Sequence, residues 1–260
     1  MMDLTDQHWA VLHPLIPTPP RRADGRGRPW ADNRKLLDGM LWVLRTGAQW
    51  EDLPRRYGSK STCHRRFQAW VEQGVFEAIL TALADDLQER GRLDLSECFV
   101  DATFASAKKG GPAIGPTRRG KGTKIMAVAD RAGLPLAVDV AAASPAEVTL
   151  VEAVLARRFV RSLPERLIGD KAYDSDPLDQ RLEELGIEMI APNRAKRRAP
   201  TQDGRPLRRY RRRWKIERLM AWLHNFRRIV TRWETKVENY LGFVHLGCVR
   251  ILLRQTTFMG

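Results

Sequence analysis

A chain of 260 residues is long enough for one large domain or two smaller ones with a sizeable hydrophobic core. Its hydrophobic fraction of 43% is ordinary for a globular protein and excludes a largely disordered chain. The 45 basic and 31 acidic residues leave a formal net charge of +14, which favours a polyanionic partner, most simply nucleic acid.

The cysteines and the apolar segments indicate the compartment. Cys63, Cys98 and Cys248 are far apart and form no paired metal-binding spacing. Because the first residues show no secretory signal pattern, we expect a reduced, cytoplasmic location, with nucleoid association when DNA is bound. The most apolar segment, residues 240–253, is too short for a membrane span and contains Arg250, so it predicts a buried helix and no membrane partner.

Residues 1–92 are expected to form an all-α domain. A first helix begins behind Thr5 or Asp6 and is ended by prolines, and a Pro/Gly/Arg linker over residues 17–30 follows. A second helix has leucines at helical spacing and closes at Gly47. A third begins behind Ser59 or Ser61, and its apolar face includes Phe67 and Trp70.

The third helix has a basic first half, which contains Lys60, His64, Arg65 and Arg66 mostly off the apolar face. A helix, a short turn and a helix with a basic N-terminal half are the outline of a helix-turn-helix DNA-binding unit. A plain helical bundle with a solvated charged face fits the same pattern. Both interpretations stay open on the pattern alone.

Residues 93–260 predict an α/β domain with a mixed sheet. Residues 97–104 alternate as a strand, and residues 123–144 predict two strands joined by a turn at 130–133. A helix is expected to open at Ser144, with Pro145 in its first turn and Glu147 completing a capping box. Next come a strand at 166–170, a helix ended by Gly186 and a strand at 187–193. Two helices, over about 212–232 and 237–255, complete the chain.

Two basic segments are candidates for contact with phosphates. Residues 191–232 contain 15 lysines and arginines against Asp203 and Glu217, a pattern that also fits a solvated or disordered segment. The loop "GPTRRGKG" (115–122) has P-loop spacing but lacks the Ser or Thr after Lys121, and a strand follows it instead of a helix. We therefore expect a basic loop near DNA phosphates, with Lys121 and Lys124 as contacts. The five histidines make no i,i+4 pair and lie near no cysteine pair, so zinc is not expected.

Carboxylates are the remaining candidates for chemistry. Asp101 interrupts an apolar strand, where a charge is costly unless it is paired or bound to a metal. Asp170 ends the apolar run "LIG" in "RLIGDKAYDSD" and is expected at the carboxyl edge of a strand, where ligands bind in open α/β sheets. If the two strands are neighbours, their carboxylates converge and favour Mg²⁺ or Mn²⁺. In the same segment, Asp174 is assigned to a turn and Asp176 to a helix N-cap before Pro177.

A third acid lies on the first of the two C-terminal helices. Steps of three and four residues place five residues on one face: Arg213, Glu217, Ala221, His224 and Arg228. Two interpretations of Glu217 stay open. It either pairs with Arg213 and offsets the local repulsion, or it is a third metal ligand within a DNA-contacting surface.

Together these segments resemble the DDE transposases of bacterial insertion sequences, in the branch related to insertion sequence five. The resemblance rests on "FVDATFASAKKGG", "GPTRRGKGTKIMAVAD", "LIGDKAYDSD" and the Y-x2-R-x3-E pattern of Tyr210, Arg213 and Glu217, and it covers essentially the whole chain. It implies a ribonuclease-H-like catalytic domain over residues 93–260, with Asp101, Asp170 and Glu217 as catalytic acids holding two Mg²⁺ or Mn²⁺ ions. The family signature continues to a lysine, where this chain has His224, whose charge depends on pH.

The implied activity is binding of the terminal inverted repeats of an insertion sequence, followed by metal-dependent DNA cleavage and strand transfer. Partners would be double-stranded DNA, as element ends and target, and a second copy of the chain in a homodimer on DNA. Tyr210, Arg213, His224 and Arg228 would hold phosphates in register, since arginine is always charged and can bind bidentately. A non-catalytic DNA-binding regulator, an inactivated relative and a nuclease that cleaves without joining are the alternatives.

Overall fold

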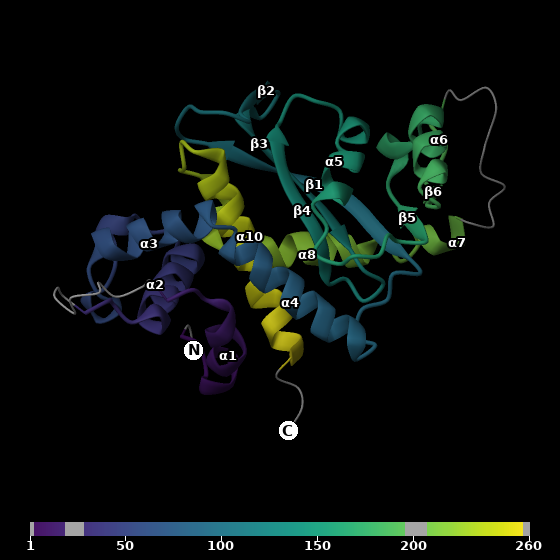
Figure 1. Cartoon of the computed structure of the whole chain (residues 1–260). Helices are drawn as coiled ribbons and strands as arrows, with labels where there is room; N and C mark the ends of the chain where they lie inside the picture. The colour runs from purple at the N-terminus through teal and green to yellow at the C-terminus, as the bar shows by residue number, and fades with distance from the viewer. Residues whose placement is uncertain (1–2, 19–28, 196–206, 257–260) are drawn as a thin grey trace.

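The computed structural model describes residues 3–18, 29–195 and 207–256. The expected Pro/Gly/Arg linker lies largely outside these residues, as does part of the basic stretch. The described residues form a mixed seven-stranded sheet flanked by helices (Figure 1). Its main strand order is β2 (Gly115–Thr117), β3 (Gly120–Ala129), β1 (Cys98–Ala107), β5 (Arg166–Ile168) and β6 (Glu188–Ile190). In addition, β4 (Pro135–Ala142) pairs with β3, and β7 (Thr231–Arg232) pairs with the end of β1.

The strand directions confirm the predicted mixed α/β sheet. β1 runs antiparallel to β3 and parallel to β5, while β5 runs parallel to β6. Phe99 of β1 is the Cα partner of Ile168 of β5. Asp101 and Asp170 each lie two residues beyond this pair along their own strand direction. The register therefore places the two acids at the same level of two neighbouring parallel strands.

The helices of residues 93–260 pack on different parts of the sheet. α5 (Val151–Ala156) contacts β3 and β4, and α6 (Asp176–Glu184) contacts β6 at the edge. α8 (Trp214–His224) lies against β1 and β3. α10 (Val237–Thr256) contacts β4 and is almost entirely buried between residues 239 and 253, which confirms the predicted C-terminal buried helix. No helix among the described residues is long and apolar enough to cross a membrane.

The N-terminal region is helical, as the sequence predicts, and lies beside the sheet (Figure 1). It contains α1 (Asp6–Leu12), α2 (Asn33–Thr46), α3 (Lys60–Glu72) and α4 (Val75–Glu89). The side chain of Asp32 caps α2 by accepting from the first-turn N–H groups, and Gly47 ends it at φ 72°, a conformation that favours glycine. Residues 47–59, with two short 3₁₀ turns (Trp50–Asp52 and Arg55–Tyr57), separate α2 from α3. This connection is longer than the turn of about three or four residues in a compact helix-turn-helix.

One hydrophobic core joins the N-terminal helices to the sheet. α10 runs from the sheet into the N-terminal region and packs against α2, α3 and α4. The boundary expected between residues 92 and 93 falls in the connection from α4 to β1. The division into two domains with separate roles stays a prediction.

Three helix boundaries differ from the expected ones. The Ser144 hydroxyl donates to the Pro116 carbonyl oxygen (3.4 Å) and caps no helix, and Glu147 opens a 3₁₀ turn before α5 begins at Val151. α6 begins at Asp176 with Ser175 as its cap residue, one position before the predicted cap. The helix expected over 212–232 is divided into α8 and α9 (Arg227–Val230), with α7 (Leu207–Tyr210) before them. The break between α8 and α9 lies at Phe226, whose extended backbone directs a buried ring into the core.

Candidate active site

Two aspartates meet at the centre of the sheet. Asp101 lies in the middle of β1, and its side chain is 17% exposed. Asp170 directly follows β5 and accepts a hydrogen bond from the Ala172 N–H (2.7 Å), which opens the 3₁₀ turn Lys171–Tyr173. Because β1 and β5 are adjacent and parallel, both carboxylates belong to the same part of the sheet. The expected convergence of these acids is thus consistent with the register.

The electrostatics of Asp101 show that acids are crowded here. Burial raises the pKa of Asp101 to about 6, while the Arg213 guanidinium and a hydrogen bond from the Ala102 N–H oppose the rise. The charges of Glu147 and Asp170 raise it further. A carboxyl that is half-protonated near pH 6 is stabilised as an anion by any added cation. The site therefore favours occupation by positive charge.

Arg213 currently supplies positive charge to the site. Its guanidinium donates to Asp101 Oδ2 (3.1 Å) and to Glu217 Oε1 (3.1 Å), so that one side chain bridges β1 and the first turn of α8. Glu217 is largely exposed, with 62% of its side chain accessible, whereas Arg213 is 15% exposed. The Arg213–Glu217 pair that the sequence left as one alternative is therefore present, and it lies directly beside Asp101.

The donor set suits a hard divalent cation, because it consists of carboxylate oxygens. Its geometry is not that of an assembled metal centre: within residues 3–18, 29–195 and 207–256, no group of three His, Cys, Asp or Glu side chains is close enough to hold a metal ion. One carboxylate oxygen of Asp101 and one of Glu217 accept hydrogen bonds from Arg213. The chemistry of the residues fits such an ion, which would compete with Arg213 if it bound these two oxygens.

Glu147 is a further acid at this site that the sequence interpretation assigned to a helix start. Its Oε2 accepts a hydrogen bond from the Tyr173 hydroxyl (3.1 Å), and its Oε1 lies 3.6 Å from Lys124 Nζ. Lys124 also donates to the Pro145 carbonyl oxygen (2.7 Å). Burial and the neighbouring Glu147 raise the pKa of Tyr173 well above its usual range, so the phenol stays protonated as a donor. Only the fold could reveal Glu147, because Ser-Pro-x-Glu also matches a capping box.

His224 lies at the other side of the aspartates. Its Nε2 is 3.0 Å from Thr103 Oγ1, and Thr103 shares a strand face with Asp101 two residues away. Burial lowers the pKa of His224 below its usual value, which favours the neutral ring. It therefore cannot replace the constant charge of the lysine expected at this position of the family signature.

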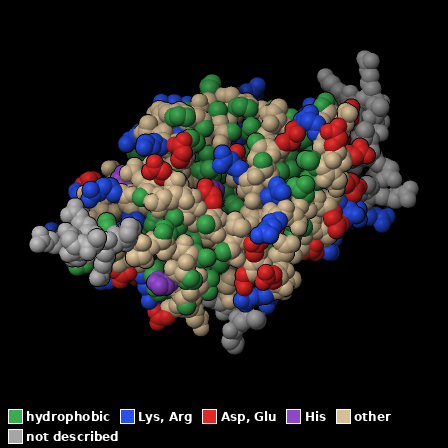
Figure 2. Space-filling view, in the orientation of Figure 1, with side chains coloured by type: hydrophobic (Ala, Val, Ile, Leu, Met, Phe, Trp, Pro, Cys, Tyr) green, Lys and Arg blue, Asp and Glu red, His purple; other side chains and the backbone are tan. Residues whose placement is uncertain are grey.

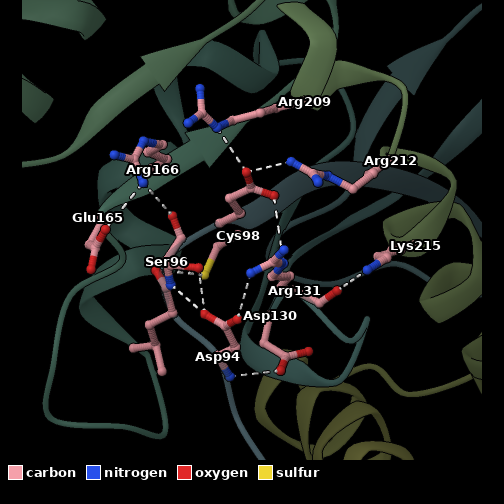
Figure 3. Close-up of polar contacts among 12 residues, drawn as sticks. Asp94, Ser96, Cys98, Asp130, Arg131, Glu165, Arg166, Arg209, Arg212 and Lys215 are labelled. Carbon is pink, nitrogen blue, oxygen red and sulfur yellow. Dashed lines mark hydrogen bonds and ion pairs between the residues drawn. The ribbon is translucent and has the colours of Figure 1, made fainter. Parts of the chain in front are cut away.

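Part of the basic stretch is neutralised inside the protein. Arg209 and Arg212 both pair with the carboxylate of Glu97, which is buried just before β1. Figure 3 shows the two arginines directed at the same carboxylate. Arg209 Nε lies 2.8 Å and an Arg212 Nη2 atom 2.5 Å from Glu97 Oε1, and Arg131 Nε is 4.0 Å from its Oε2. The next residue, Arg213, is thereby held over Asp101. Tyr210 packs beneath it, with the Arg213 guanidinium carbon 6.0 Å from the ring centroid.

The basic residues predicted on α3 have different surroundings. Lys60 and Arg65 are exposed at the start of the helix, and Lys60 pairs with a nearby glutamate. His64 is stacked on Trp50 with ring centroids 4.8 Å apart, and Arg66 is half-buried against aromatic rings. Arg65 is thus open to a partner and Lys60 is exposed but paired, while His64 and Arg66 are mainly packed against the protein.

The remaining predicted DNA contacts also differ in exposure. Lys121 is exposed on β3, and Lys124 is bound beside Glu147. Arg228 is only 5% exposed and forms an ion pair with Glu234 (Nη2 to Oε1, 2.6 Å). It lies on α9, after the chain has turned away from the helix face that contains Glu217. The shared face expected for these residues therefore ends at His224.

Comparison with known proteins places this architecture in a family. The model described as "Transposase DDE domain" matches residues 92–252, and the model described as "Putative transposase of IS4/5 family" matches residues 4–80. The chain belongs to the DDE transposase family. The "Putative transposase for insertion sequence element IS402" of Burkholderia cepacia is 36% identical over 162 residues, 59% of this chain and 72% of the relative. The "Putative transposase for insertion sequence element IS6501" of Brucella ovis is 32% identical over 136 residues, 51% of this chain and 98% of that relative.

A solved structure supports the same fold for this transposase. The piggyBac transposase, determined by cryo-EM as a synaptic complex with hairpin DNA, superposes with a TM-score of 0.55 at 12% identity. The match covers 95% of this chain and 70% of the other. The family matches and this likeness confirm the predicted ribonuclease-H-like fold class of an insertion-sequence DDE transposase.

Proposed function

We propose that this transposase binds the terminal inverted repeats of its insertion sequence and catalyses metal-dependent DNA cleavage and strand transfer. The observation that carries the proposal is the placement of Asp101 and Asp170 at one level of two adjacent parallel strands, with Glu217 linked to Asp101 through Arg213. Family membership supports a transposition enzyme in general. The assignment of these three acids as catalytic residues is ours.

In this proposal, Asp101, Asp170 and Glu217 hold two Mg²⁺ or Mn²⁺ ions. Such ions polarise the scissile phosphate and lower the pKa of an attacking water or of a DNA 3′-hydroxyl. Arg213 transfers its guanidinium from the carboxylates to a phosphate, and the ring of Tyr210 supports it. Glu147 holds Tyr173 and Lys124 against the site. His224 positions Thr103 beside Asp101 as a hydrogen-bonding partner.

The DNA partners are the element ends and the target, and the exposed Lys60, Arg65 and Lys121 are proposed contacts. Residues 1–92 are proposed to supply recognition of the ends, and a homodimer on DNA would bring two ends together. A cytoplasmic location follows from this substrate. Each of these roles extends the family assignment and needs its own measurement.

The central experiment incubates the purified full chain with Mg²⁺ and a duplex that carries the element end. Cleavage and joined products are expected from the native protein. Asp101→Asn and Asp170→Asn should each abolish both products and leave DNA binding in place. Asp52→Asn is the matched control, since it makes the same change in an exposed turn and should leave both reactions intact.

The outcome separates the alternatives. Products at native levels from either Asp101→Asn or Asp170→Asn would disprove the assignment of these acids. Specific DNA binding with no metal-dependent product from the native chain would identify a regulator or an inactive relative, in which Arg213 permanently neutralises the acids. Cleaved ends without joined products would identify a nuclease.

A further inference from the structure

A second group of arginines comes mostly from outside the basic stretch over residues 191–232. On the face shown in Figure 2, basic and acidic side chains are interspersed among the described residues and form no extended basic surface. The arginines concerned line two adjacent cavities where α2, the turn from α8 to α9, and α10 come together. We call this feature the arginine cleft, and its members are Arg45, Arg56, Arg227, Arg250 and Arg254.

The two cavities of the arginine cleft share part of their lining. One has a volume of about 770 Å³ and contains Arg45, Arg56 and Arg227, and the other has a volume of about 300 Å³ and contains Arg45, Arg250 and Arg254. Arg45 and Asn225 line both. The space is therefore large enough for several phosphate groups.

The positive charges of Arg45 and Arg227 have little compensation in the cleft. Asp3 is the acid in the lining, and its carboxylate already accepts a hydrogen bond from the Tyr57 hydroxyl (2.7 Å), which in turn accepts one from Arg56. Within the part of the chain that the structure describes, neither Arg45 nor Arg227 forms an ion pair with a carboxylate. Burial lowers the pKa of Arg250, and the charges of Arg254 and Arg45 lower it further. An anion in the cleft would relieve this repulsion.

The walls of the cleft are held in fixed positions. A Cβ added at Gly47, the residue that ends α2, would lie 2.9 Å from Arg227 Cβ, so the end of α2 touches the start of α9. The buried Arg228 donates to the carbonyl oxygens of Gly47 (3.4 Å) and Ala48 (3.1 Å) and keeps the two segments together. Arg45 and Arg227 are therefore presented from two rigid sides of the opening.

The cleft adjoins the candidate active site. His224 lines the larger cavity and is also the residue whose ring meets Thr103, two positions from Asp101. A nucleic-acid strand that leaves the acids over His224 would enter the cleft directly. Guanidinium groups suit this path because they bind phosphates bidentately and keep their charge at any physiological pH.

We propose that the arginine cleft binds the sugar-phosphate backbone of DNA next to the scissile position. The inference rests on the proposed function, because it takes DNA as the substrate. The backbone could belong to the element end or to the target, which have the same chemistry. Arg45 and Arg227 make the principal contacts, as they are exposed and without ionic partners among the described residues.

The test measures DNA binding by the full chain without divalent ions, so that it does not depend on catalysis. Fluorescence anisotropy would give the Kd from about 50 to 200 mM salt for two duplexes of equal length, one with the terminal repeat and one of unrelated sequence. R45Q/R227Q should lower the log–log salt slope by about 1.8, or about 0.9 for each lost phosphate contact, and should weaken binding at least about tenfold. R45K/R227K keeps the charges and should restore most of the slope.

R92Q/R161Q is the matched control, since it removes two exposed arginines from outside the cleft. A slope for R45Q/R227Q equal to that of this control would overturn the proposal. Weaker binding of both duplexes would assign the cleft to target or flanking DNA, and weaker binding of the repeat duplex alone would assign it to the element end. Both results support the cleft.

Failure of the cleft and failure of the proposed function give different results. If the cleft variant binds like the control while the native chain cleaves and joins DNA with Mg²⁺, the cleft is wrong and the function stands. If R45Q/R227Q shows the predicted decrease in salt slope while the native chain forms no product, the proposal for the cleft stands and the catalytic assignment is wrong.

Discussion

Arg228 offers the sharpest test of how the structure changes the interpretation of a residue. The sequence placed it among the DNA contacts, whereas its guanidinium is enclosed between the end of α2 and α9. It donates from Nε to Glu234 Oε1 (2.8 Å) and from Nη1 to the Ala48 carbonyl oxygen (3.1 Å), and both side chains of the ion pair are under 10% exposed. We therefore expect Arg228→Met to destabilise the protein while leaving DNA affinity unchanged.

The magnitude follows from the burial of both partners. Removal of one member of a buried ion pair costs about 3–5 kcal/mol, because the other charge stays buried without compensation. Methionine keeps the apolar length of the side chain over Phe243, so little packing is lost. In Arg228→Met with Glu234→Leu, no charge is left behind. The double variant should therefore recover more than half of the loss, although the carbonyl groups at the end of α2 lose a donor.

Urea unfolding followed by tryptophan fluorescence would measure these differences in the free energy of unfolding. Arg227→Met is the matched control, because the neighbouring side chain is exposed and should change stability by about 0.5 kcal/mol or less. A loss below about 1 kcal/mol for Arg228→Met, together with a shallower salt dependence of DNA binding, would refute the structural role and return Arg228 to the DNA contacts.

Three further predictions concern charge and backbone conformation. Burial lowers the pKa of His245 to about 3, so below pH 6.5 the unfolded chain binds a proton at this residue that the folded chain does not bind. The free energy of unfolding should therefore fall by about 2 kcal/mol from pH 7 to pH 5. His245→Gln should remove this part of the loss in urea titrations at the two pH values. Glu97→Gln should lower the free energy of unfolding by about 1–2 kcal/mol in calorimetry, because Arg209 and Arg212 lose their shared anion. An unchanged Tm would contradict this role of Glu97. Gly111→Ala should cost at least about 2 kcal/mol in chemical unfolding, since its φ is 141° and the new Cβ would lie 2.2 Å from the Thr235 carbonyl oxygen. Gly91 also has a positive φ, 64°, but open space around it, so Gly91→Ala should cost about 1 kcal/mol.

The sequence was sufficient for the strands that form the centre of the sheet. β1 alternates and β5 is a short apolar run, and these patterns depend only on which face of each strand is buried. Asp101 and Asp170 could be selected as candidate site residues because a charge inside or at the end of an apolar strand is costly unless it is paired or binds a ligand. The α/β class and the buried C-terminal helix follow from the same local periodicity.

Contacts between distant segments could not be predicted in this way. Arg228 meets the carbonyl groups of residues 47 and 48, and no periodicity along the chain relates these positions. The break before α9 depends on the burial of the Phe226 ring in the core, while the helical pattern of its neighbours continues through it. Glu147 fits a capping box equally well, and only the fold brings it beside Tyr173, which follows β5, and Lys124 of β3.

The arginines of this chain show why net charge is a poor guide to a binding surface. Arg209 and Arg212 are neutralised by Glu97 inside the protein. Arg45 lies outside the basic stretch and Arg227 near its end, and neither forms an ion pair with a carboxylate among the described residues. A phosphate binds most favourably to a guanidinium that is not already paired with another anion. Arginines without a carboxylate partner are the ones that can offer their guanidinium groups directly to a phosphate.

Arg213 stands between these two groups and links the proposed metal site to the DNA. Its guanidinium neutralises Asp101 and Glu217, so a divalent ion that uses the same oxygen atoms must compete with it. A DNA phosphate attracts the same guanidinium and would lower the cost of that exchange. By thermodynamic reciprocity, DNA that draws Arg213 away strengthens ion binding by the same factor by which ions strengthen DNA binding. In the proposed function, the acids would therefore assemble around the ions chiefly when DNA is present, which would limit cleavage to the bound substrate.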